Sequence, residues 1–170
     1  VWFVLSAFAA LPFVFSELDM SVADGFFEAA SGFTTTGSTV IVGLDDAPKG
    51  ILLWRALLKW LGGVGIIVLG VAILPILRMG GMQLFKMESS DKSDKVKPRI
   101  TQVASSILVV YVTFTVVSAI GLWLTGMTVF DAICHAFAAL GTGGFSTSDQ
   151  SLAKWGALTQ WVTIGAMLLG

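Results

Sequence analysis

The stretch "FFEAASGFTTTGSTV", residues 26–40, raises the question that decides the fold, because an apolar run ends in a cluster of hydroxyls around one glycine. The apolar segment 23–33 is too short to cross a bilayer, which needs about 20 apolar residues of helix. The loop "TTTGST", 34–39, follows it directly. Non-helical backbone at membrane depth is tolerated only where it is buried or lines a wet cavity. In a membrane protein, this stretch predicts a re-entrant helix that ends at a functional loop.

The composition indicates an integral membrane protein. Hydrophobic residues make up 55% of the 170 residues and charged residues only 12%, whereas soluble domains carry about 25% charged residues. The formal net charge of −1 gives no sign of nucleic-acid binding. Cys134 is the one cysteine, which excludes an intrachain disulfide and a cysteine-based metal site. We therefore expect an all-α membrane protein.

Uncharged windows locate the membrane spans. An inner helix over 50–78 and an outer helix over 100–126 are long enough to cross a bilayer. The apolar segments 1–16 and 155–170 are shorter, and we expect each to be a span that is cut by a chain end. The segment 1–16 lacks the basic flank of a signal peptide.

Basic residues gather around the connector 79–99, which therefore faces the cytoplasm by the positive-inside rule. They are six of the ten Lys and Arg, namely Arg78, Lys86, Lys92, Lys95, Lys97 and Arg99. The segments 17–49 and 127–154 then lie outside. There the acids Glu17, Asp19, Asp45, Asp46 and Asp149 outnumber the bases Lys49 and Lys154. These acids form either a vestibule that concentrates cations or ordinary solvated loop charges.

The two halves of the chain repeat at an offset of 107 residues. The shift places Asp24 on Asp131, Thr35 on Thr142, Gly37 on Gly144, Trp54 on Trp161 and Gly63 on Gly170. Transporters are often built from such repeats. We therefore expect a first pore unit over 1–78 and a second over 100–170, in which 128–140 is the pore helix and 141–146 the filter. Asp24 and Asp131 lie near the pore-helix starts, where carboxylates cap free N–H groups.

The two loops have the chemistry of a cation filter. Successive carbonyl oxygens can replace the hydration shell of a cation, as they do in the TVGYG loops of potassium channels, and glycine lets them turn to one side. The C-terminal ends of the preceding short helices add partial negative charge. The predicted ion-binding residues, which hold K⁺ through their backbone carbonyls, are Thr35, Thr36, Gly37, Ser38, Thr142, Gly143, Gly144 and Phe145, the last at the place of the TVGYG tyrosine.

Three charged residues are candidates for supporting the filter. Arg55 and Lys59 lie one helical turn apart on the inner helix, and Glu28 lies on the first pore helix. Either one of the cations pairs with Glu28 and fixes the filter, or both extend to the membrane interface. His135 falls on Glu28 in the repeat. Because the chain has no second histidine, we expect His135 to be packed and hydrogen-bonded rather than a metal ligand.

Four stretches resemble the Trk/Ktr superfamily of potassium transporters, and they cover nearly the whole chain. They are "FFEAASGFTTTGSTVIVGLDD", "LLWRALLKWLGGVGIIVLGVAILPIL", "MQLFKMESSDKSDKVKPR" and "CHAFAALGTGGFSTSD". The resemblance implies potassium uptake across the bacterial inner membrane through four pore units, each with a filter glycine, here Gly37 and Gly144. It also implies a homodimer with a cytoplasmic nucleotide-binding TrkA-like regulatory subunit, K⁺ as the transported ion and no covalently bound cofactor. Two of the four units are present here.

Other functions remain as alternatives. A sodium-permeable relative, or one that couples K⁺ to Na⁺ or H⁺, would have the same architecture, and an unrelated polytopic transporter is a more distant alternative. An anion carrier would present helix N-termini and basic residues, whereas these loops present helix C-termini and hydroxyls. An intramembrane enzyme would need a nucleophile–base pair or a metal cluster within the spans. The sequence provides no such group, and we expect no catalytic residues.

Overall fold

The computed structural model describes residues 2–82 and 96–170, and it describes side chains over 2–70 and 103–170. In these residues all regular structure is helical, which confirms the expected all-α fold. Most of the predicted cytoplasmic loop 79–99 lies outside the described residues. The helices are α1 (Trp2–Val14), α2 (Val22–Phe33), α3 (Lys49–Met82), α4 (Val96–Leu124), α5 (Val129–Leu140), the 3-10 turn η2 (Ser151–Lys154) and α6 (Ala157–Leu169).

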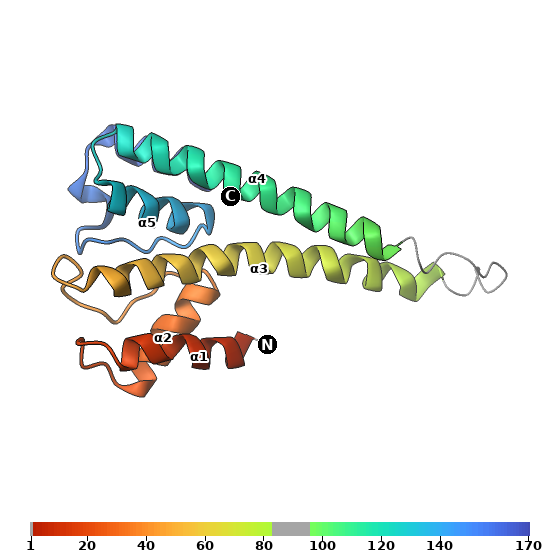
Figure 1. Cartoon of the computed structure of the whole chain (residues 1–170), viewed down its shortest axis with the longest axis horizontal. Coiled ribbons are helices and arrows are strands. Elements are labelled where there is room, and N and C mark those ends of the chain that lie inside the picture. The colour runs from red at the N-terminus through yellow and green to blue at the C-terminus, as the bar shows by residue number, and fades with distance from the viewer. Residues whose placement is uncertain (1, 83–95) are drawn as a thin grey trace.

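The helices form two groups, α1–α3 and α4–α6, and in Figure 1 the long helix α3 lies between α1 and α2 on one side and α4 and α5 on the other. In the first group, α1, α2 and α3 pack through Phe13, Ala29 and Leu58, all of which are fully buried. In the second, α4 and α5 pack through buried Leu122 and Ala136. Burying apolar side chains between the helices of each group supplies close packing, which drives helix association in lipid.

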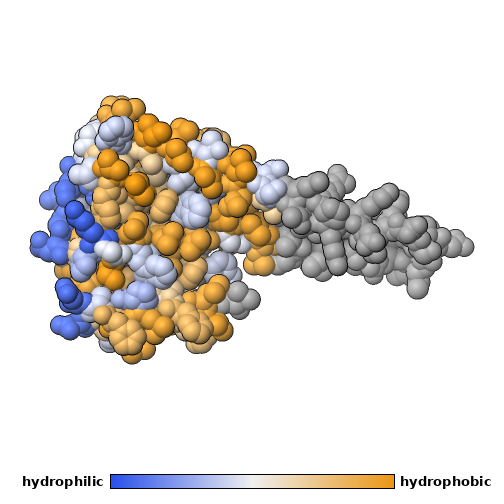
Figure 2. All heavy atoms as spheres, in the orientation of Figure 1, coloured by the Kyte–Doolittle hydropathy of each residue, from blue (hydrophilic) through white to orange (hydrophobic). Residues whose placement is uncertain are grey.

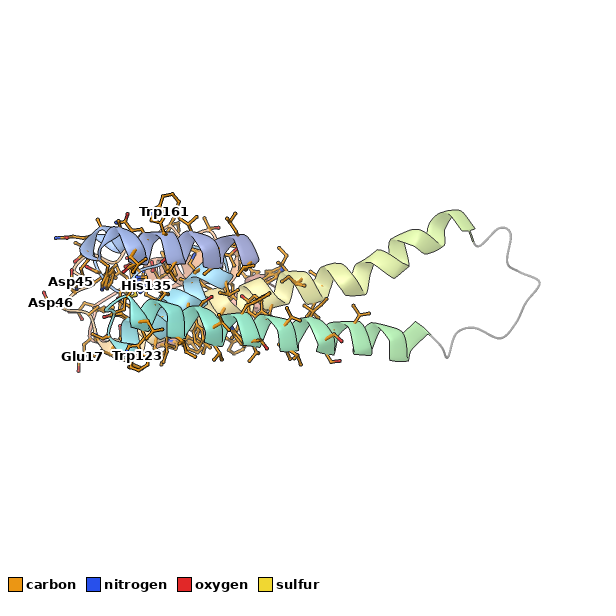
Figure 3. All side chains as sticks on the ribbon, turned by 90° about the horizontal axis from the view of Figure 1, so that it is seen from above. Glu17, Asp45, Asp46, Trp123, His135 and Trp161 are labelled. Carbon is orange, nitrogen blue, oxygen red and sulfur yellow. The ribbon has the colours of Figure 1, made fainter. Side chains whose placement is uncertain are left out.

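The two long helices have the length and apolarity of membrane spans. Lys49–Gly70 and Val103–Leu124 each have 22 residues, with mean hydropathies of 1.7 and 2.3. The sides of the molecule in Figure 2 are mostly apolar, and hydrophilic residues gather at one end. Glu17, Asp45 and Asp46 lie at that end (Figure 3). This distribution is what a bilayer around the helices and water at the acidic end would require.

The two short helices α2 and α5 are local copies of each other. Each has 12 residues, and their first residues, Val22 and Val129, are 107 apart. The sequence predicted starts at 23 and 128, within one residue of those observed. Both helices have apolar sequences that are too short to span a membrane.

The caps of these helices differ from the prediction. Ser21 Oγ accepts a hydrogen bond from the Asp24 N–H at 3.1 Å, and Thr128 Oγ1 accepts one from the Asp131 N–H at 3.1 Å. Each hydroxyl also donates to the aspartate carboxylate at 2.7 Å. The capping residues are therefore the hydroxyl residues, and the aspartates occupy the first turn, where a carboxylate suits the helix dipole.

The repeat offset changes from 107 to 108 beyond the loops. The first residues of α3 and α6, Lys49 and Ala157, are 108 apart. A Cβ on Gly62 would collide with the Phe33 carbonyl oxygen, and one on Gly170 would collide with that of Leu140. In the repeat, Gly170 therefore corresponds to Gly62, and the predicted correspondence with Gly63 was wrong. One extra residue lies between the second loop and α6, which a gapless shift cannot reveal.

Candidate functional site: two matched filter loops

The predicted filter loops, 34–39 and 141–146, have the same backbone conformation. Thr35 and Thr142 have φ values of 55° and 48°, and Gly37 and Gly144 have 89° and 72°. Glycine adopts positive φ at no steric cost, which explains the two glycines. Threonine in this region is a real outlier, because its branched Cβ crowds the backbone. Strain of this kind persists where the surrounding structure enforces it, and it clusters at functional sites.

The helix ends that lead into the loops are matched as well. The N–H groups of Thr34, Thr35 and Thr36 bond back to the carbonyls of Ala30, Gly32 and Ser31 at 2.9–3.1 Å. Those of Gly141, Thr142 and Gly143 make the corresponding bonds to Phe137, Ala139 and Ala138 at 2.9–3.2 Å. Both loops therefore leave the C-terminus of a short helix, where carbonyl oxygens carry partial negative charge.

The loops abut each other, since a Cβ on Gly37 would collide with the carbonyl oxygen of Gly143. Three carbonyls of this region accept side-chain donors. Ser38 O accepts from Ser31 Oγ at 2.6 Å, Gly143 O from Lys59 Nζ at 2.5 Å, and Ser146 O from Arg55 Nη1 at 3.1 Å.

Other carbonyls of the loops have no donor in the part of the chain that the structure describes: those of Thr35, Thr36, Gly37, Thr142, Gly144 and Phe145. Thr142 and Gly144 are exposed, whereas Gly143 and Phe145 are buried. The eight predicted ion-binding residues thus lie together, but they divide into a group with free carbonyls and a pair, Ser38 and Gly143, with bonded ones.

A buried ion pair lies behind the first loop. Arg55 Nε is 2.7 Å from Glu28 Oε1, and the two side chains are 1% and 0% exposed. The predicted pairing of a cation with Glu28 is therefore present. Glu28 also accepts from Thr39 Oγ1 at 2.9 Å and from the Val40 N–H at 3.1 Å. The carboxylate holds the chain just after the first loop.

Arg55 connects this pair to the second loop. Its Nη2 donates to Thr39 Oγ1 at 3.0 Å, and its Nη1 donates to Ser146 O at 3.1 Å. The guanidinium has a rigid fork of donors that can hold several acceptors at once. Arg55 therefore bonds the last residue of each loop.

Lys59 pairs with no carboxylate among the described residues. Its ammonium donates to Gly143 O, and it lies 4.1 Å from the centre of the Phe145 ring. The Arg55 guanidinium lies over the same ring, also at 4.1 Å. Lys59 is fully buried. The buried cluster of Glu28, Arg55 and Lys59 thus has two cations and one carboxylate.

The second unit has His135 in the place that corresponds to Glu28. His135 Nδ1 is 2.8 Å from the carbonyl oxygen of Asp131, which can only accept, so Nδ1 carries a proton. Its Nε2 is 3.0 Å from Ser146 Oγ. No cluster of metal-ligating side chains occurs within the described residues. His135 is thus packed and hydrogen-bonded, as predicted.

The outer loops of the two units are joined by two aspartates that the sequence did not single out as partners. Asp149 Oδ1 accepts from the N–H groups of Gly43 and Leu44 at 3.1 and 3.0 Å. Asp45 accepts from Ser148 Oγ at 3.1 Å and from Lys154 Nζ at 2.7 Å. The Lys154 ammonium lowers the pKa of the Asp45 carboxyl below its ordinary value of 3.8. No local pattern could have found these contacts, because they join residues more than 100 positions apart.

Comparisons with known proteins identify the family. The family model described as "TrkH: Cation transport protein" matches residues 1–170. The chain is 49% identical to "Trk system potassium uptake protein TrkH" of Escherichia coli K12, over 99% of this chain and 35% of that protein. It is 45% identical to "Trk system potassium uptake protein TrkI" of Halomonas elongata, over 99% of this chain and 34% of that one.

A solved structure is similar as well. The crystal structure of the potassium transporter TrkH from Vibrio parahaemolyticus superposes with a TM-score of 0.84 at 44% identity, covering 99% of this chain and 33% of that chain. The chain thus spans about a third of the length of the relatives it matches.

Proposed function

This chain belongs to the TrkH family of cation transport proteins, and we propose that it forms part of a potassium uptake pathway across a bacterial inner membrane. Relatives named as Trk system potassium uptake proteins, with up to 50% identity, support the choice of ion. The chain spans about a third of their length, so the activity, partners and location of the whole protein are all part of this proposal.

The observation that carries the proposal is the pair of abutting loops with free carbonyls. Thr35, Thr36 and Gly37 in the first loop, and Thr142 and Gly144 in the second, have carbonyl oxygens without a protein donor within the described residues. Carbonyl oxygens in this arrangement can replace the water around a dehydrated alkali cation. The process needs no covalent step, only coordination that is strong enough to admit the ion and weak enough to release it.

The acidic end of the molecule would supply ions to these loops. Glu17, Asp45 and Asp46 lie at the end where hydrophilic residues gather (Figures 2 and 3). Clustered negative charge raises the local concentration of cations. The ion would enter from this end, pass the free carbonyls of the two loops and approach the C-termini of α2 and α5, where the helix dipoles favour a cation.

Two pore units alone do not enclose a four-part ring. The relatives are about three times as long, and we propose that two further units complete the ring. We also propose that the complete protein is a homodimer in the lipid bilayer, with a cytoplasmic nucleotide-binding TrkA-like subunit. The name "Trk system" of the relatives is consistent with a partner subunit.

Gly144→Ser in the intact protein tests the filter. A Cβ at Gly144 meets nothing within 4 Å, so the change acts on the loop backbone, whose φ of 72° favours glycine. We expect ⁸⁶Rb⁺ uptake by a potassium-uptake-deficient bacterium to fall by about tenfold or more, because moving the free carbonyls by ~1 Å disrupts ion coordination.

Gly126→Ser is the matched control. Gly126 also has a positive φ, 102°, and open space around its Cβ position, but it lies before α5 and outside the loops. Both variants should accumulate equally in the membrane. If Gly144→Ser transports Rb⁺ as the parent does, with the same preference for K⁺ over Na⁺, these loops are not the filter. If the parent transports Na⁺ as well as K⁺, the sodium-permeable alternative is correct.

A further inference from the structure

Of the two cations in the buried cluster, Lys59 has no ion pair with an acid in the part of the chain that the structure describes. Glu28 is bonded to Arg55, and the Lys59 ammonium bonds the Gly143 carbonyl and lies against the Phe145 ring. With one carboxylate and two cations, the cluster has a net charge of +1. A fully buried cation without a carboxylate is expensive, and a carbonyl oxygen and an aromatic face are the groups that offset this cost here.

The position of this charge relates it to the ion path of the proposed filter. The Gly143 carbonyl is directed at Lys59, whereas the carbonyls of its neighbours Thr142 and Gly144 have no donor within the described residues. Those two neighbours are exposed, and Gly143 and Lys59 are buried. Lys59 therefore lies on the buried side of the second loop, where it contacts the Gly143 carbonyl and lies close to Gly37 of the first loop.

The second unit has no such charge. At the offset of 108 that relates α3 to α6, Lys59 corresponds to Met167 and Arg55 to Thr163. Met167 and Thr163 line a cavity of about 70 Å³ behind the second loop, together with His135 and Phe145. Of the two units, the first alone thus carries a charge at this position of its inner helix.

We propose that Lys59 lowers the affinity of the filter for its ion, because it withdraws the Gly143 carbonyl from ion coordination and places a positive charge beside the two loops. An ammonium bonded to a loop carbonyl repels any cation held by the adjacent carbonyls. It lowers the affinity of the filter for its ion and speeds the release of the ion. This inference rests on the proposed function of the loops as a cation filter.

Lys59→Gln removes the positive charge but keeps a hydrogen-bond donor, because the glutamine amide can still donate to Gly143 O. The variant also leaves Glu28 and Arg55 as a neutral pair. In the intact protein we expect the half-saturating Rb⁺ concentration (KM) to fall roughly three- to tenfold, since the repulsion at this separation is removed. The maximal rate should fall or stay level, because a more tightly held ion leaves more slowly.

Three further variants make the test specific. Lys59→Met, which copies Met167, removes both the charge and the donor and should also lower KM. Lys59→Arg retains the charge and should stay closer to the parent KM than either neutral variant. Lys49→Gln makes the same chemical change at an exposed position at the start of α3, and it should leave KM as in the parent.

An unchanged or raised KM in Lys59→Gln, with uptake by the parent intact, overturns this inference and leaves the proposed filter standing. Failure of both neutral variants to accumulate as folded protein also overturns it, because Lys59 would then be needed for the fold. If the parent itself takes up no Rb⁺ above the level of an empty vector, both the inference and the proposed function fail.

Discussion

At the scale of single residues, the main energetic cost is the burial of the charged side chains of Glu28 and Arg55. Both are buried and lie 2.7 Å apart, and a second cation, Lys59, is buried beside them. Desolvating ions costs several kcal/mol each, so a buried pair contributes little net stability, but breaking it leaves an uncompensated charge. The network joins the two loops through Thr39 and Ser146. Loss of one partner should therefore affect both units.

The net charge of the cluster of Glu28, Arg55 and Lys59 predicts which neutral substitution destabilises the protein more. Glu28→Gln raises the charge from +1 to +2, whereas Arg55→Gln lowers it to 0, with Lys59 left as a counterion. We expect Glu28→Gln to destabilise the protein by about 3–5 kcal/mol and Arg55→Gln by less. Unfolding of the purified protein in mixed micelles, followed by tryptophan fluorescence, measures both. Equal losses, or a larger loss for Arg55→Gln, would contradict the charge argument.

Part of this cluster could be predicted from the sequence and part could not. The pairing of a cation with Glu28 was one of two alternatives for the basic residues one turn apart on an apolar helix, the other being extension to the membrane interface. The bond from Lys59 to Gly143 joins residues 84 positions apart. It depends on how α3 packs against the second loop, which no local spacing encodes. The sequence also did not show whether Arg55 or Lys59 forms the ion pair with Glu28, because both lie on one face of the helix.

At the scale of elements, the two pore helices follow from short local patterns. A hydroxyl residue, an aspartate three positions later and a twelve-residue apolar helix recur at 107 residues. Capping and turn chemistry act over a few residues, so the sequence predicted these helices to within one residue. The long helices were less well bounded: α3 extends to Met82 rather than 78, and α4 begins at Val96 rather than 100. Both ends border residues 83–95, which lie outside the described part of the chain.

The matched caps predict matched losses. Ser21→Ala and Thr128→Ala each remove the acceptor for an N–H group in the first turn, at 3.1 Å in both cases. We expect each to cost about 1 kcal/mol, within the usual range for an N-cap. Thermal melting of the purified variants measures this. Thr113→Ala is the control, because its exposed hydroxyl donates to the Val109 carbonyl within α4 and caps nothing. Unequal losses at the two caps would show that the units are less alike than their backbones indicate.

At the scale of the whole molecule, the two units are joined at three levels. Arg55 and Lys59 bridge the loops, the Trp60 ring packs on Tyr111 and Phe137 at centroid distances of 5.5 Å, and the outer loops exchange bonds through Asp45 and Asp149. The repeat predicted two like units but gave no information about their contacts. These contacts break the symmetry of the repeat, because the residues that meet across the two units do not occupy equivalent positions in the repeat.

The ion pair at the acidic end predicts how stability varies with pH. Lys154 lowers the pKa of Asp45 below 3.8, and Asp45 raises the pKa of Lys154 above 10.5. A lowered carboxyl pKa stabilises the fold above 3.8 and loses this effect as the pH falls through the folded-state pKa. A raised lysine pKa stabilises the fold below 10.5 and loses this effect as the pH rises through its folded-state value. The contribution is therefore full between the two ordinary values.

Lys154→Gln should remove the contribution of this ion pair to stability, and with it the losses of stability at low and at high pH. The two side chains are 49% and 41% exposed, so salt screens the pair and its effect is small. We expect the melting temperature of the variant to lie slightly below that of the parent near pH 7, and the difference to vanish below the folded-state pKa of Asp45 and in high salt. Asp46→Asn, a charge loss at the exposed neighbouring acid, is the control. A difference that persists at low pH would mean that Lys154 stabilises the outer loops by packing against Trp155, whose ring lies 5.6 Å from its ammonium, rather than by charge.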